Sequence, residues 1–390
     1  MYEGRKRVKK VCFVIPNLGG GGAQRVLLNI LRHIDHSKFD PHLILFEKKR
    51  FEKKGDLLFD LPSDINVRVL RSKKYRRFLK WFYFLKLVKL LKAEGPDAVV
   101  SFMWKLNAAV LLSKKMSRTK AKIIISERGS TAIYNGRFVN FQRSLAIRFF
   151  YPKAEKIIFP SRDMADKIVK SYGIEKQKMN IIHNPVDIAM ITERAQERIE
   201  DPVYQAKNNI IISIGRLGKE KGFAYLIRAI SLLSKNDIDC KLVILGEGAE
   251  ENNLYNLSKE LNIEDRVRFL GFRSNPYKYL ARSKIFVLSS LYEGFPNVLL
   301  EAMALGVPSI ATRCPTGPEE IITDEVNGLL IPQADEKALA NAIKKLLLDK
   351  DLRERLSEAA RKRAEDFRVE KIIMQYEDVI DNVCAASAEN

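Results

Sequence analysis

The sequence predicts an α/β protein with two doubly wound domains that face each other across a cleft. Apolar runs typical of buried strands alternate with helical patterns, which indicates parallel sheets covered by helices on both faces. The alternation stops at a polar stretch, residues 192–208, and then starts again. With 390 residues, the chain is long enough for two domains that each bury a core of their own.

The expected elements follow from the apolar runs typical of buried strands and from the apolar periodicity typical of helices. In the first half, strands are expected at residues 11–15, 43–46, 98–102, 122–125 and 156–159, and helices at residues 23–34, 75–93, 106–117, 139–151 and 162–172. In the second half, strands are expected at residues 210–214, 241–245, 267–270, 285–288 and 308–311. Helices are expected there at residues 223–233, 250–261, 276–282, 298–305, 336–348, 352–367 and 369–380.

Four segments are expected along the chain. They are a first domain at residues 1–190, a linker at 191–208, a second domain at 209–366 and a C-terminal helix at 367–390. The linker is assigned from its polar composition and Pro202. We expect the C-terminal helix to pack back toward the first domain.

Composition and charge limit the possible functions. Apolar residues make up 46% of the chain and charged residues 30%, as in soluble globular proteins. The net charge of +20 favours anionic partners such as nucleotide diphosphates, lipid phosphates or acidic membrane surfaces. The sequence contains no recognised nucleic-acid-binding module, so we expect no nucleic-acid partner.

Targeting and metal signals are weak. Every window of 18 residues carries a charge, so no membrane span is expected, and the short apolar stretch near the N-terminus predicts a strand rather than a signal peptide. The four cysteines are scattered, without the spacing of zinc ligands. We therefore expect reduced thiols, a cytosolic protein and no metal site.

Two carboxylates eight residues apart, Glu293 and Glu301, are the most informative feature. A predicted strand precedes them, and a Gly-Phe-Pro-Asn turn leads into a predicted helix. A strand–turn–helix unit presents ligand-binding groups, because the N-terminus of the helix offers N–H groups to an anion. The spacing by itself also fits a general acid/base couple, or a buried turn followed by a surface ion pair.

The first predicted strand is followed by four consecutive glycines, Gly19, Gly20, Gly21 and Gly22, and then by a helix. Glycines at this point allow the backbone to approach a phosphate or a sugar closely. Their spacing differs from the G-x-G-x-x-G pattern of dinucleotide sites, and no acidic residue follows where a ribose ligand belongs. A flexible turn without a ligand is the alternative.

The second half opens with a comparable loop that contains Arg216 and Lys221. A guanidinium offers forked hydrogen bonds and an ammonium a point charge, and together they suit a diphosphate. Solvated surface positions are the alternative. The later strand end at Gly271 and Phe272 could hold a base, although Phe272 fits a core position equally well.

An ordered series of motifs makes the chain recognisable. GGGGAQRVLLNI, HNPVD, GRLGKEKG, LGEG, FLGF, EGFPNVLLEAMALGVPSIAT and NGLLIP follow one another between about Lys10 and Ile380. In this order the motifs resemble the retaining glycosyltransferases of family 4. The resemblance implies the GT-B architecture, in which two Rossmann-like domains face each other across a cleft. It also implies an acceptor-binding first domain, a nucleotide-sugar-binding second domain, and no cofactor besides the nucleotide diphosphate sugar.

The resemblance implies roles by position. Glu301 would bind the donor ribose, and Glu293 would face the transferred sugar. Arg216 and Lys221 would neutralise the leaving diphosphate in place of a metal ion. The remaining donor-binding residues would be Gly19, Gly20, Gly21, Gly22, Gly271, Phe272, Phe295, Pro296, Asn297, Val298 and Leu299.

The chain departs from the family on the acceptor side. Many relatives carry a histidine after the fourth strand of the first domain, where this chain has Arg128. Arginine does not act as a base near neutral pH. The neighbouring Glu127, or the donor phosphate, would then orient the acceptor proton.

A basic and apolar segment at residues 73–92 is the second unusual feature. As one helix it would have apolar surface on both sides with cations between. The functional interpretation is a helix that binds a membrane surface or a lipid diphosphate, and a core helix with snorkelling lysines is the alternative. The cations expected to contact the membrane or lipid are Arg76, Arg77, Lys80, Lys86 and Lys89.

We therefore expect a retaining, metal-independent glycosyltransferase that moves a hexose or N-acetylhexosamine from a UDP-sugar to a glycan. The expected acceptor is linked to a polyprenyl diphosphate, in the synthesis of surface polysaccharides or glycoconjugates. The protein would lie in the cytoplasm, peripherally at the anionic inner face of the cell membrane. The alternatives are a nucleotide-sugar epimerase of the same fold and a non-catalytic protein that binds a sugar nucleotide or a lipid.

Overall fold

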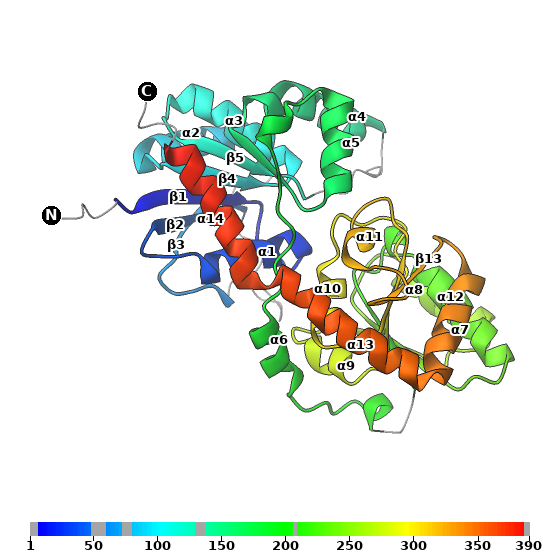
Figure 1. The fold of residues 1–390 in the computed structure, drawn as a ribbon. Helices are drawn as coiled ribbons and strands as arrows, with labels where there is room; N and C mark the ends of the chain where they lie inside the picture. Colours follow the sequence, from blue (N-terminus) through cyan, green and yellow to red (C-terminus); the bar gives the residue numbers. More distant parts are fainter. Residues whose placement is uncertain (1–6, 48–59, 72–79, 129–136, 206–208, 386–390) are drawn as a thin grey trace. The chain divides into compact units, whose positions relative to one another are not determined.

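The computed structural model describes residues 7–47, 60–71, 80–128, 137–205 and 209–385 (Figure 1). The chain divides into two compact units, one of Met1–Pro185 together with Val369–Asn390 and the other of Val186–Arg368. Each unit contains one parallel sheet with hydrophobic cores on both of its faces. Both are therefore doubly wound α/β units.

The first unit is built on a seven-stranded parallel sheet with the order β3-β2-β1-β4-β5-β6-β7. Its central strand β4 is apolar except for Ser101, and all five residues of β4 are buried. Phe13 of β1 pairs with Val100 of β4, where the strand order reverses. The strands are β1 (Lys9–Ile15), β2 (Phe39–Glu47), β3 (Asn66–Arg71), β4 (Ala98–Phe102), β5 (Lys122–Ser126), β6 (Lys156–Phe159) and β7 (Met179–Ile181).

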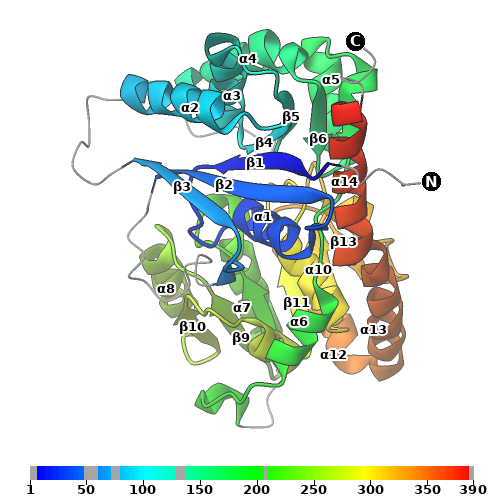
Figure 2. The same cartoon turned by 90° about the vertical axis from the view of Figure 1, so that its left-hand side faces the viewer.

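Helices cover both faces of this sheet (Figure 2). On one face lie α1 (Gly22–His33) and α14 (Val369–Ala385). On the other lie α2 (Lys80–Glu94), α3 (Trp104–Ser117), α4 (Arg137–Phe150) and α5 (Arg162–Tyr172). The ends of α5 show how local sequence sets a helix. Ser161 accepts a hydrogen bond from the Met164 N–H at its start, and Gly173 adopts a left-handed conformation at its end.

The second unit is built on a six-stranded parallel sheet with the order β10-β9-β8-β11-β12-β13. The order reverses between β8 and β11, where Phe286 pairs with Ile212. Ligands of open α/β sheets bind outside the carboxyl ends of the strands at such a reversal. The strands are β8 (Ile210–Ile214), β9 (Lys241–Leu245), β10 (Val267–Gly271), β11 (Ile285–Leu288), β12 (Ser309–Thr312) and β13 (Leu329–Ile331).

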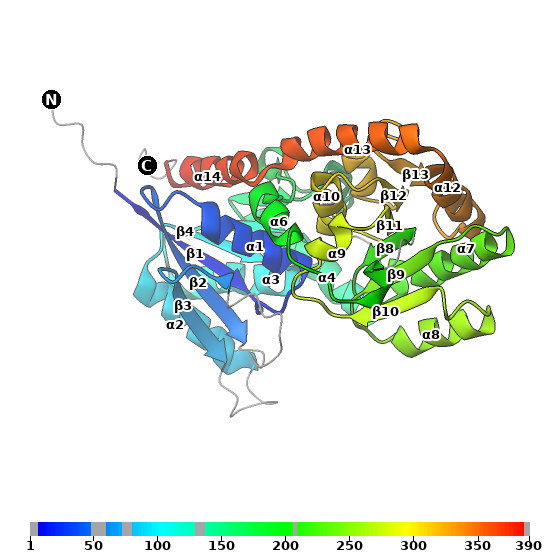
Figure 3. The ribbon, with the colours of Figure 1, turned by 90° about the horizontal axis from the view of Figure 1, so that it is seen from below.

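Two layers of helices cover the second sheet (Figure 3). One layer contains α6 (Ile188–Ala195), α9 (Tyr277–Ala281) and α10 (Asn297–Ala304). The other contains α7 (Phe223–Lys235), α8 (Glu251–Glu260) and α12 (Glu336–Leu348). Helix α13 (Lys350–Ala364) contributes to both cores, and α11 (Pro318–Ile321) is a single turn after β12.

The structure contains three strands that the sequence pattern did not predict, β3, β7 and β13. Each lies at an edge of its sheet, where only one side is hydrogen-bonded to a neighbour. β7 and β13 have three residues each, and β3 is interrupted by Arg68. Such strands lack the continuous apolar run that marks a central parallel strand.

The expected linker at residues 191–208 begins inside a helix. Asp187 caps α6 by accepting a hydrogen bond from the Met190 N–H at 3.0 Å. Ile191 and Ala195 are buried in the core of the second unit. The polar residues of this stretch face outward from an amphipathic helix, which is why its composition alone suggested a linker.

The C-terminal helix α14 belongs to the first unit. Its buried residues include Ile373 and Tyr376, which join the core formed by β1 and α1. Glu377 accepts a hydrogen bond from the Asp35 N–H at 2.8 Å, and Asp381 pairs with Lys9 at 2.5 Å. The last helix is therefore part of the first core, although the whole second unit precedes it in the chain.

Candidate active site

Most of the predicted donor residues lie at the carboxyl ends of β8 and β11, where the strand order of the second sheet reverses. The loop after β8 contains Arg216 and Lys221, and the loop after β11 contains Glu293. The two loops are joined directly, since the backbone carbonyl of Glu220 accepts a hydrogen bond from the Leu291 N–H at 2.8 Å. This junction is the position that the topology assigns to a ligand.

Lys221 and Glu293 form an ion pair. Lys221 Nζ lies 2.6 Å from Glu293 Oε1, and the Ser290 hydroxyl donates to the same oxygen at 2.7 Å. Glu293 and Ser290 are buried, whereas 23% of the Lys221 side chain is exposed. The carboxylate is thus held in place by two donors, one of which is still accessible at the surface.

Residues that follow β12 in the chain hold the loop that carries Glu293 by hydrogen bonds. Cys314 Sγ donates to the Ser290 carbonyl at 3.0 Å, and Gln333 Nε2 donates to the Leu291 carbonyl at 2.5 Å. The Thr316 hydroxyl donates to the carbonyl of Glu293 itself. Burial raises the pKa of the Cys314 thiol to about 11, so it remains a neutral donor near pH 7. These contacts fix the backbone around the carboxylate.

Glu301 lies in the second turn of α10 and is buried. The Tyr277 hydroxyl donates to its Oε1 at 3.5 Å, and the Arg194 guanidinium lies 5.7 Å from the centre of the Tyr277 ring. Pro296 occupies the N-cap position, one residue before the helix begins at Asn297. The amides of this first turn point out of the helix N-terminus, where an anion is favoured.

The turn before α10 offers backbone rather than side chains to a ligand. Phe295 and Leu299 are buried in the core of the second unit, and the Phe295 ring lies 5.7 Å from that of Phe367. Val298 is partly buried against the same core. The predicted donor contacts at these positions would therefore be made by main-chain atoms.

Arg216 pairs with a different carboxylate from Lys221. Its side chain is 76% exposed and forms an ion pair with Glu220 Oε1 at 2.5 Å. The structure thus pairs Lys221 with Glu293, and Arg216 with Glu220. An exposed arginine in a surface pair can leave its partner at little cost.

Two glycines allow the close packing of strand ends around the site. Gly222 has φ +62°, and a Cβ there would lie 2.1 Å from the Ser289 carbonyl oxygen. Gly246, with φ +140°, would place a Cβ 1.8 Å from the Gly215 carbonyl oxygen. Only glycine fits at either position. At the tip of β10, Gly271 has φ +68° and the following Phe272 is exposed, so its ring is available to a base.

The glycine loop of the first unit leads into α1. Gly20 has φ +81°, Gly21 is the N-cap and Gly22 is the first residue of the helix. The Gly19 N–H donates to Asn17 Oδ1 at 3.1 Å, which tightens the turn. The loop therefore presents backbone at the carboxyl end of β1, next to the reversal between β1 and β4.

The predicted acceptor residue Glu127 is a core residue. It is fully buried, accepts a hydrogen bond from the Tyr151 hydroxyl and lies 3.4 Å from Arg143 Nη2. Burial, followed by the charge of Glu127, raises the pKa of Tyr151 well above its usual range. The enclosure of its carboxylate favours a structural role, and the orientation of an acceptor proton by Glu127 stays a prediction.

Arg128 joins three segments of the first unit. It donates hydrogen bonds to Ser126 Oγ at 2.8 Å, to Asn184 Oδ1 and to the Tyr376 hydroxyl of α14. Burial lowers the pKa of its guanidinium to about 9, so it stays protonated at neutral pH. The residue thus ties the end of β5 to the C-terminal helix, and it does not act as a base.

The basic segment is a core helix over its described part. Tyr83, Phe84, Leu87 and Leu91 of α2 are buried, while Lys89 is exposed. These burials favour the alternative of a core helix with lysines at its surface. None of the helices in the described ranges has both the length and the hydropathy of a membrane span.

The cations of this segment are only partly described. Lys86 Nζ donates to the Leu70 carbonyl at 3.4 Å and lies 5.9 Å from the centre of the Tyr83 ring. Arg76 and Arg77 lie outside the described residues, and Lys80 begins α2 with a side chain that also lies outside them. The lipid contacts predicted for this segment therefore stay predictions.

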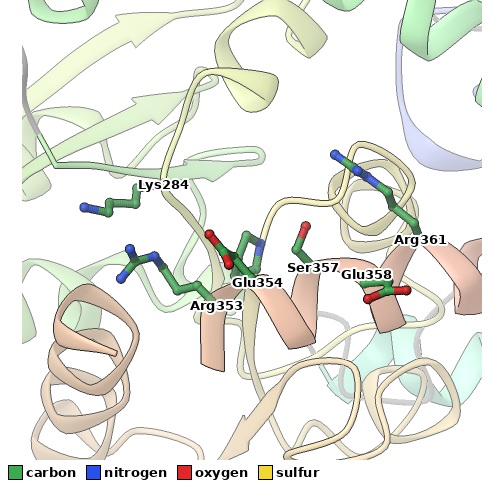
Figure 4. A pocket seen from close by; sticks show the side chains of 7 residues that line it. Lys284, Arg353, Glu354, Ser357, Glu358 and Arg361 are labelled. Carbon is green, nitrogen blue, oxygen red and sulfur yellow. The ribbon is translucent and has the colours of Figure 1, made fainter. Parts of the chain in front are cut away.

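A pocket on the second unit lies away from this site. It is bordered by residues that precede β11 and β12, at the opposite ends of the strands from Glu293. Its lining residues are Lys284, Pro308, Arg353, Glu354, Ser357, Glu358 and Arg361 (Figure 4). Lys284 donates to Asn209 Oδ1 at 2.8 Å, and Arg353 to the Leu346 carbonyl at 2.6 Å. These side chains stabilise the fold, and the pocket shows no convergent chemistry.

Three residues that contact the glutamates were not expected from the sequence pattern. Ser290 and Thr316 contact Glu293, and Tyr277 contacts Glu301. Ser290 could have been found, because it follows a central strand and precedes Glu293 by three residues. Tyr277 lies 24 residues before Glu301, and no local signal connects the two.

Comparisons with known proteins assign most of the chain to a family. Residues 195–363 match the family model "Glycosyl transferases group 1", and residues 20–190 match the model "Glycosyltransferase Family 4". The chain is 33% identical over 373 residues to the N-acetylgalactosamine-N,N'-diacetylbacillosaminyl-diphospho-undecaprenol 4-alpha-N-acetylgalactosaminyltransferase of Campylobacter jejuni. That alignment covers 94% of this chain and 97% of the relative.

Two further similarities agree with this result. The chain is 30% identical to the lipopolysaccharide core biosynthesis glycosyltransferase LpsD of Rhizobium meliloti, over 86% of this chain and 88% of the relative. The structure of HepE from Anabaena in complex with UDP-glucose matches with a TM-score of 0.79 and 21% identity, and covers 96% of this chain and 100% of that one. The chain therefore belongs to the group 1 glycosyltransferases of family 4, and its two doubly wound units have the GT-B fold that the sequence predicts.

Proposed function

We propose that this glycosyltransferase moves a hexose or N-acetylhexosamine from a UDP-sugar to a lipid-linked glycan, with retention of the anomeric configuration. The observation that carries the proposal is the pair of Lys221 and Glu293 at the carboxyl ends of β8 and β11. Glu301 follows eight residues later, in the second turn of α10. We assign Lys221 to the diphosphate, Glu293 to the transferred sugar and Glu301 to the ribose.

The chemistry requires charge stabilisation at the diphosphate. The bond between the anomeric carbon and the diphosphate oxygen breaks, and the acceptor oxygen bonds to the same face of that carbon. Positive charge develops on the sugar and negative charge on UDP, and fixed cations lower the barrier. Lys221 and Arg216 would supply these cations in place of a metal ion, with Glu293 facing the sugar.

The acceptor proton would pass to the leaving diphosphate. Arg128 stays protonated near neutral pH, and Glu127 is fully buried. We therefore assign the base to neither residue. Since the leaving UDP oxygens gain negative charge as the bond breaks, they are the base that the reaction itself provides.

The donor and acceptor classes are supported by similar proteins. HepE from Anabaena is described in complex with UDP-glucose, and the Campylobacter relative is named for a diphospho-undecaprenol acceptor. We assign donor binding to the second unit and acceptor binding to the first. The net charge of +20 supports a peripheral position at the anionic inner face of the cell membrane.

A donor panel tests the proposal. UDP release would be measured with UDP-glucose, UDP-galactose and their N-acetylated forms, using polyprenyl-diphosphate-linked glycans as acceptors. Lys221→Ala and Glu301→Ala should abolish most of the turnover, by at least about a hundredfold. The matched controls Lys235→Ala and Glu325→Ala, which change an exposed lysine and an exposed glutamate elsewhere in the second unit, should keep it.

Three outcomes would contradict the proposal. Full turnover by both site variants would show that the donor binds elsewhere. Conversion of the donor without any acceptor would indicate an epimerase. Binding of UDP without turnover of any donor would indicate a non-catalytic protein.

A further inference from the structure

A stripe of exposed apolar side chains runs along α4 in the first unit. Phe141, Leu145 and Phe149 recur every four residues, and they are 60%, 38% and 57% exposed. The same helix buries Ala146 and Ile147 against the sheet. At about 100° per residue, the three exposed side chains lie on the side of the helix opposite the core.

The surroundings of this stripe are basic. The sequences of α3 and α4 contain no aspartate or glutamate. Arg148 on α4 and Lys153 just after it are exposed, and so is Lys115 of α3. The two helices pack side by side in the layer that covers this face of the sheet (Figure 2). Exposed cations therefore lie on the helix that carries the stripe, just after that helix and on the neighbouring α3.

This combination indicates the kind of partner. Two phenylalanines and a leucine in one exposed line form an apolar surface that a lone soluble helix rarely presents. Apolar side chains flanked by lysine and arginine are typical of helices that lie in the interface of a bilayer, where cations meet lipid phosphates. Charge complementarity therefore selects an anionic lipid surface as the occupant.

We propose that α4 docks the first unit on an anionic bilayer. Phe141, Leu145 and Phe149 enter the boundary between headgroups and acyl chains, and Arg148 and Lys153 contact lipid phosphates. The inference rests on the proposed function, because a lipid-linked acceptor is presented at such a surface. Arg143 of α4 lies 3.4 Å from Glu127, the residue that follows β5, so docking places the bilayer near the end of β5.

This assignment differs from the sequence expectation for α2. Tyr83, Phe84, Leu87 and Leu91 of α2 are buried, whereas the residues of the α4 stripe face solvent. These four side chains fill a core and are not available to a bilayer. Membrane binding through α4 consequently does not require α2 to leave the sheet.

Vesicle flotation tests the proposal with the full chain. The wild type should float with vesicles that contain phosphatidylglycerol and remain behind with vesicles of phosphatidylcholine alone. The double variant F141S/F149S should lower the affinity for the anionic vesicles by about tenfold or more. The double variant R148Q/K153Q should show a smaller loss together with a weaker dependence on salt.

The matched control is L348S/M374S. Leu348 and Met374 are 67% and 62% exposed on α12 and α14, so this variant removes a similar exposed apolar area elsewhere. It should float like the wild type. Equal flotation of F141S/F149S and the wild type, or equal losses in both serine variants, would overturn the proposal. Thermal unfolding of all variants shows that the fold is retained.

Two further measurements distinguish membrane docking from catalysis and from self-association. Transfer to a short water-soluble acceptor without vesicles should be equal in the wild type and F141S/F149S. Loss of all transfer with intact vesicle binding refutes the proposed function and leaves the docking surface supported. Sedimentation that shows a wild-type dimer, lost in F141S/F149S with unchanged flotation, would identify a second copy as the occupant and overturn the proposal.

Discussion

Two buried glutamates, Glu127 in the first unit and Glu293 in the second, have partners of the same chemical kinds. They differ in how exposed the cationic partner is. Each follows the carboxyl end of a parallel strand, and the described partners of each include a cation and a hydroxyl group. The partners of Glu127 are Arg143 and Tyr151, and all three side chains are buried.

The partners of Glu293 are arranged differently. Ser290 is buried, but the Lys221 side chain is 23% exposed, compared with 9% for that of Arg143. An ion pair whose cation is enclosed serves the fold, because neither partner can exchange for a ligand. An ion pair whose cation reaches the surface can share it with an anionic substrate. Both sites contain an ion pair, and they differ in the accessibility of its cation.

The largest effect is expected at the enclosed pair. Glu127→Gln should lower the free energy of unfolding by about 3 kcal/mol, because the buried charge of Arg143 loses its carboxylate. Urea denaturation measures the loss. Transfer per folded molecule should stay close to that of the wild type, and a selective loss of transfer with unchanged stability would place Glu127 in the acceptor site after all.

The same substitution at the accessible pair should lower the activity more than the stability. Glu293→Gln should lower kcat by about fiftyfold, or about 2 kcal/mol, because it removes the charge that we propose to face the sugar. The free energy of unfolding should change by less than about 1 kcal/mol, since Lys221 can turn to solvent. Steady-state kinetics and urea denaturation of both glutamine variants, measured side by side, test the comparison directly.

Ser290 should act through Glu293. Ser290→Ala removes one of the two donors to Oε1 and should lower kcat by about tenfold, with donor KM less affected. Ser290→Thr keeps the hydroxyl and should recover most of the activity. If alanine and threonine lowered kcat equally, packing rather than the hydrogen bond would explain the loss.

The smallest effect concerns the thiol that supports the same loop. Burial raises the pKa of Cys314 to about 11 from its usual value of 9.0. The pKa of this thiol is higher in the folded state than in the unfolded state. Its contribution to the free energy of unfolding is therefore fully present below about pH 9 and is lost as the pH rises through about 11. Between pH 8 and pH 10 the wild type should lose about 1 kcal/mol more stability than Cys314→Ala. Parallel loss in both proteins would show that this thiol does not ionise on unfolding.

Much of the donor site is predictable because its signals are local. The strand Ile285–Leu288, the turn after it and the helix Asn297–Ala304 lie within one residue of their expected positions. An apolar run, a Gly-Pro turn and helical periodicity each depend on neighbours in the chain. The placement of Glu293 and Glu301 at a strand end and a helix start follows from these signals.

Other parts depend on distant residues and could not be predicted. Lys221 meets Glu293 across 72 positions, and Arg128 meets Tyr376 across 248. The second part of helix α6, from residue 191, is expected as linker, since its polar residues give no sign that Ile191 is buried. Edge strands such as β3 could not be predicted from apolar runs either, because only one of their sides pairs with another strand.

The sequence by itself determined the family, the doubly wound fold and the loops that carry the donor residues. Only the tertiary structure decided which charged and apolar residues are enclosed. It buries Glu127, fills the core with the apolar residues described in α2 and leaves the stripe of Phe141, Leu145 and Phe149 exposed. The physical reason is that backbone conformation responds to adjacent residues, whereas burial is set by elements that meet from far apart in the chain.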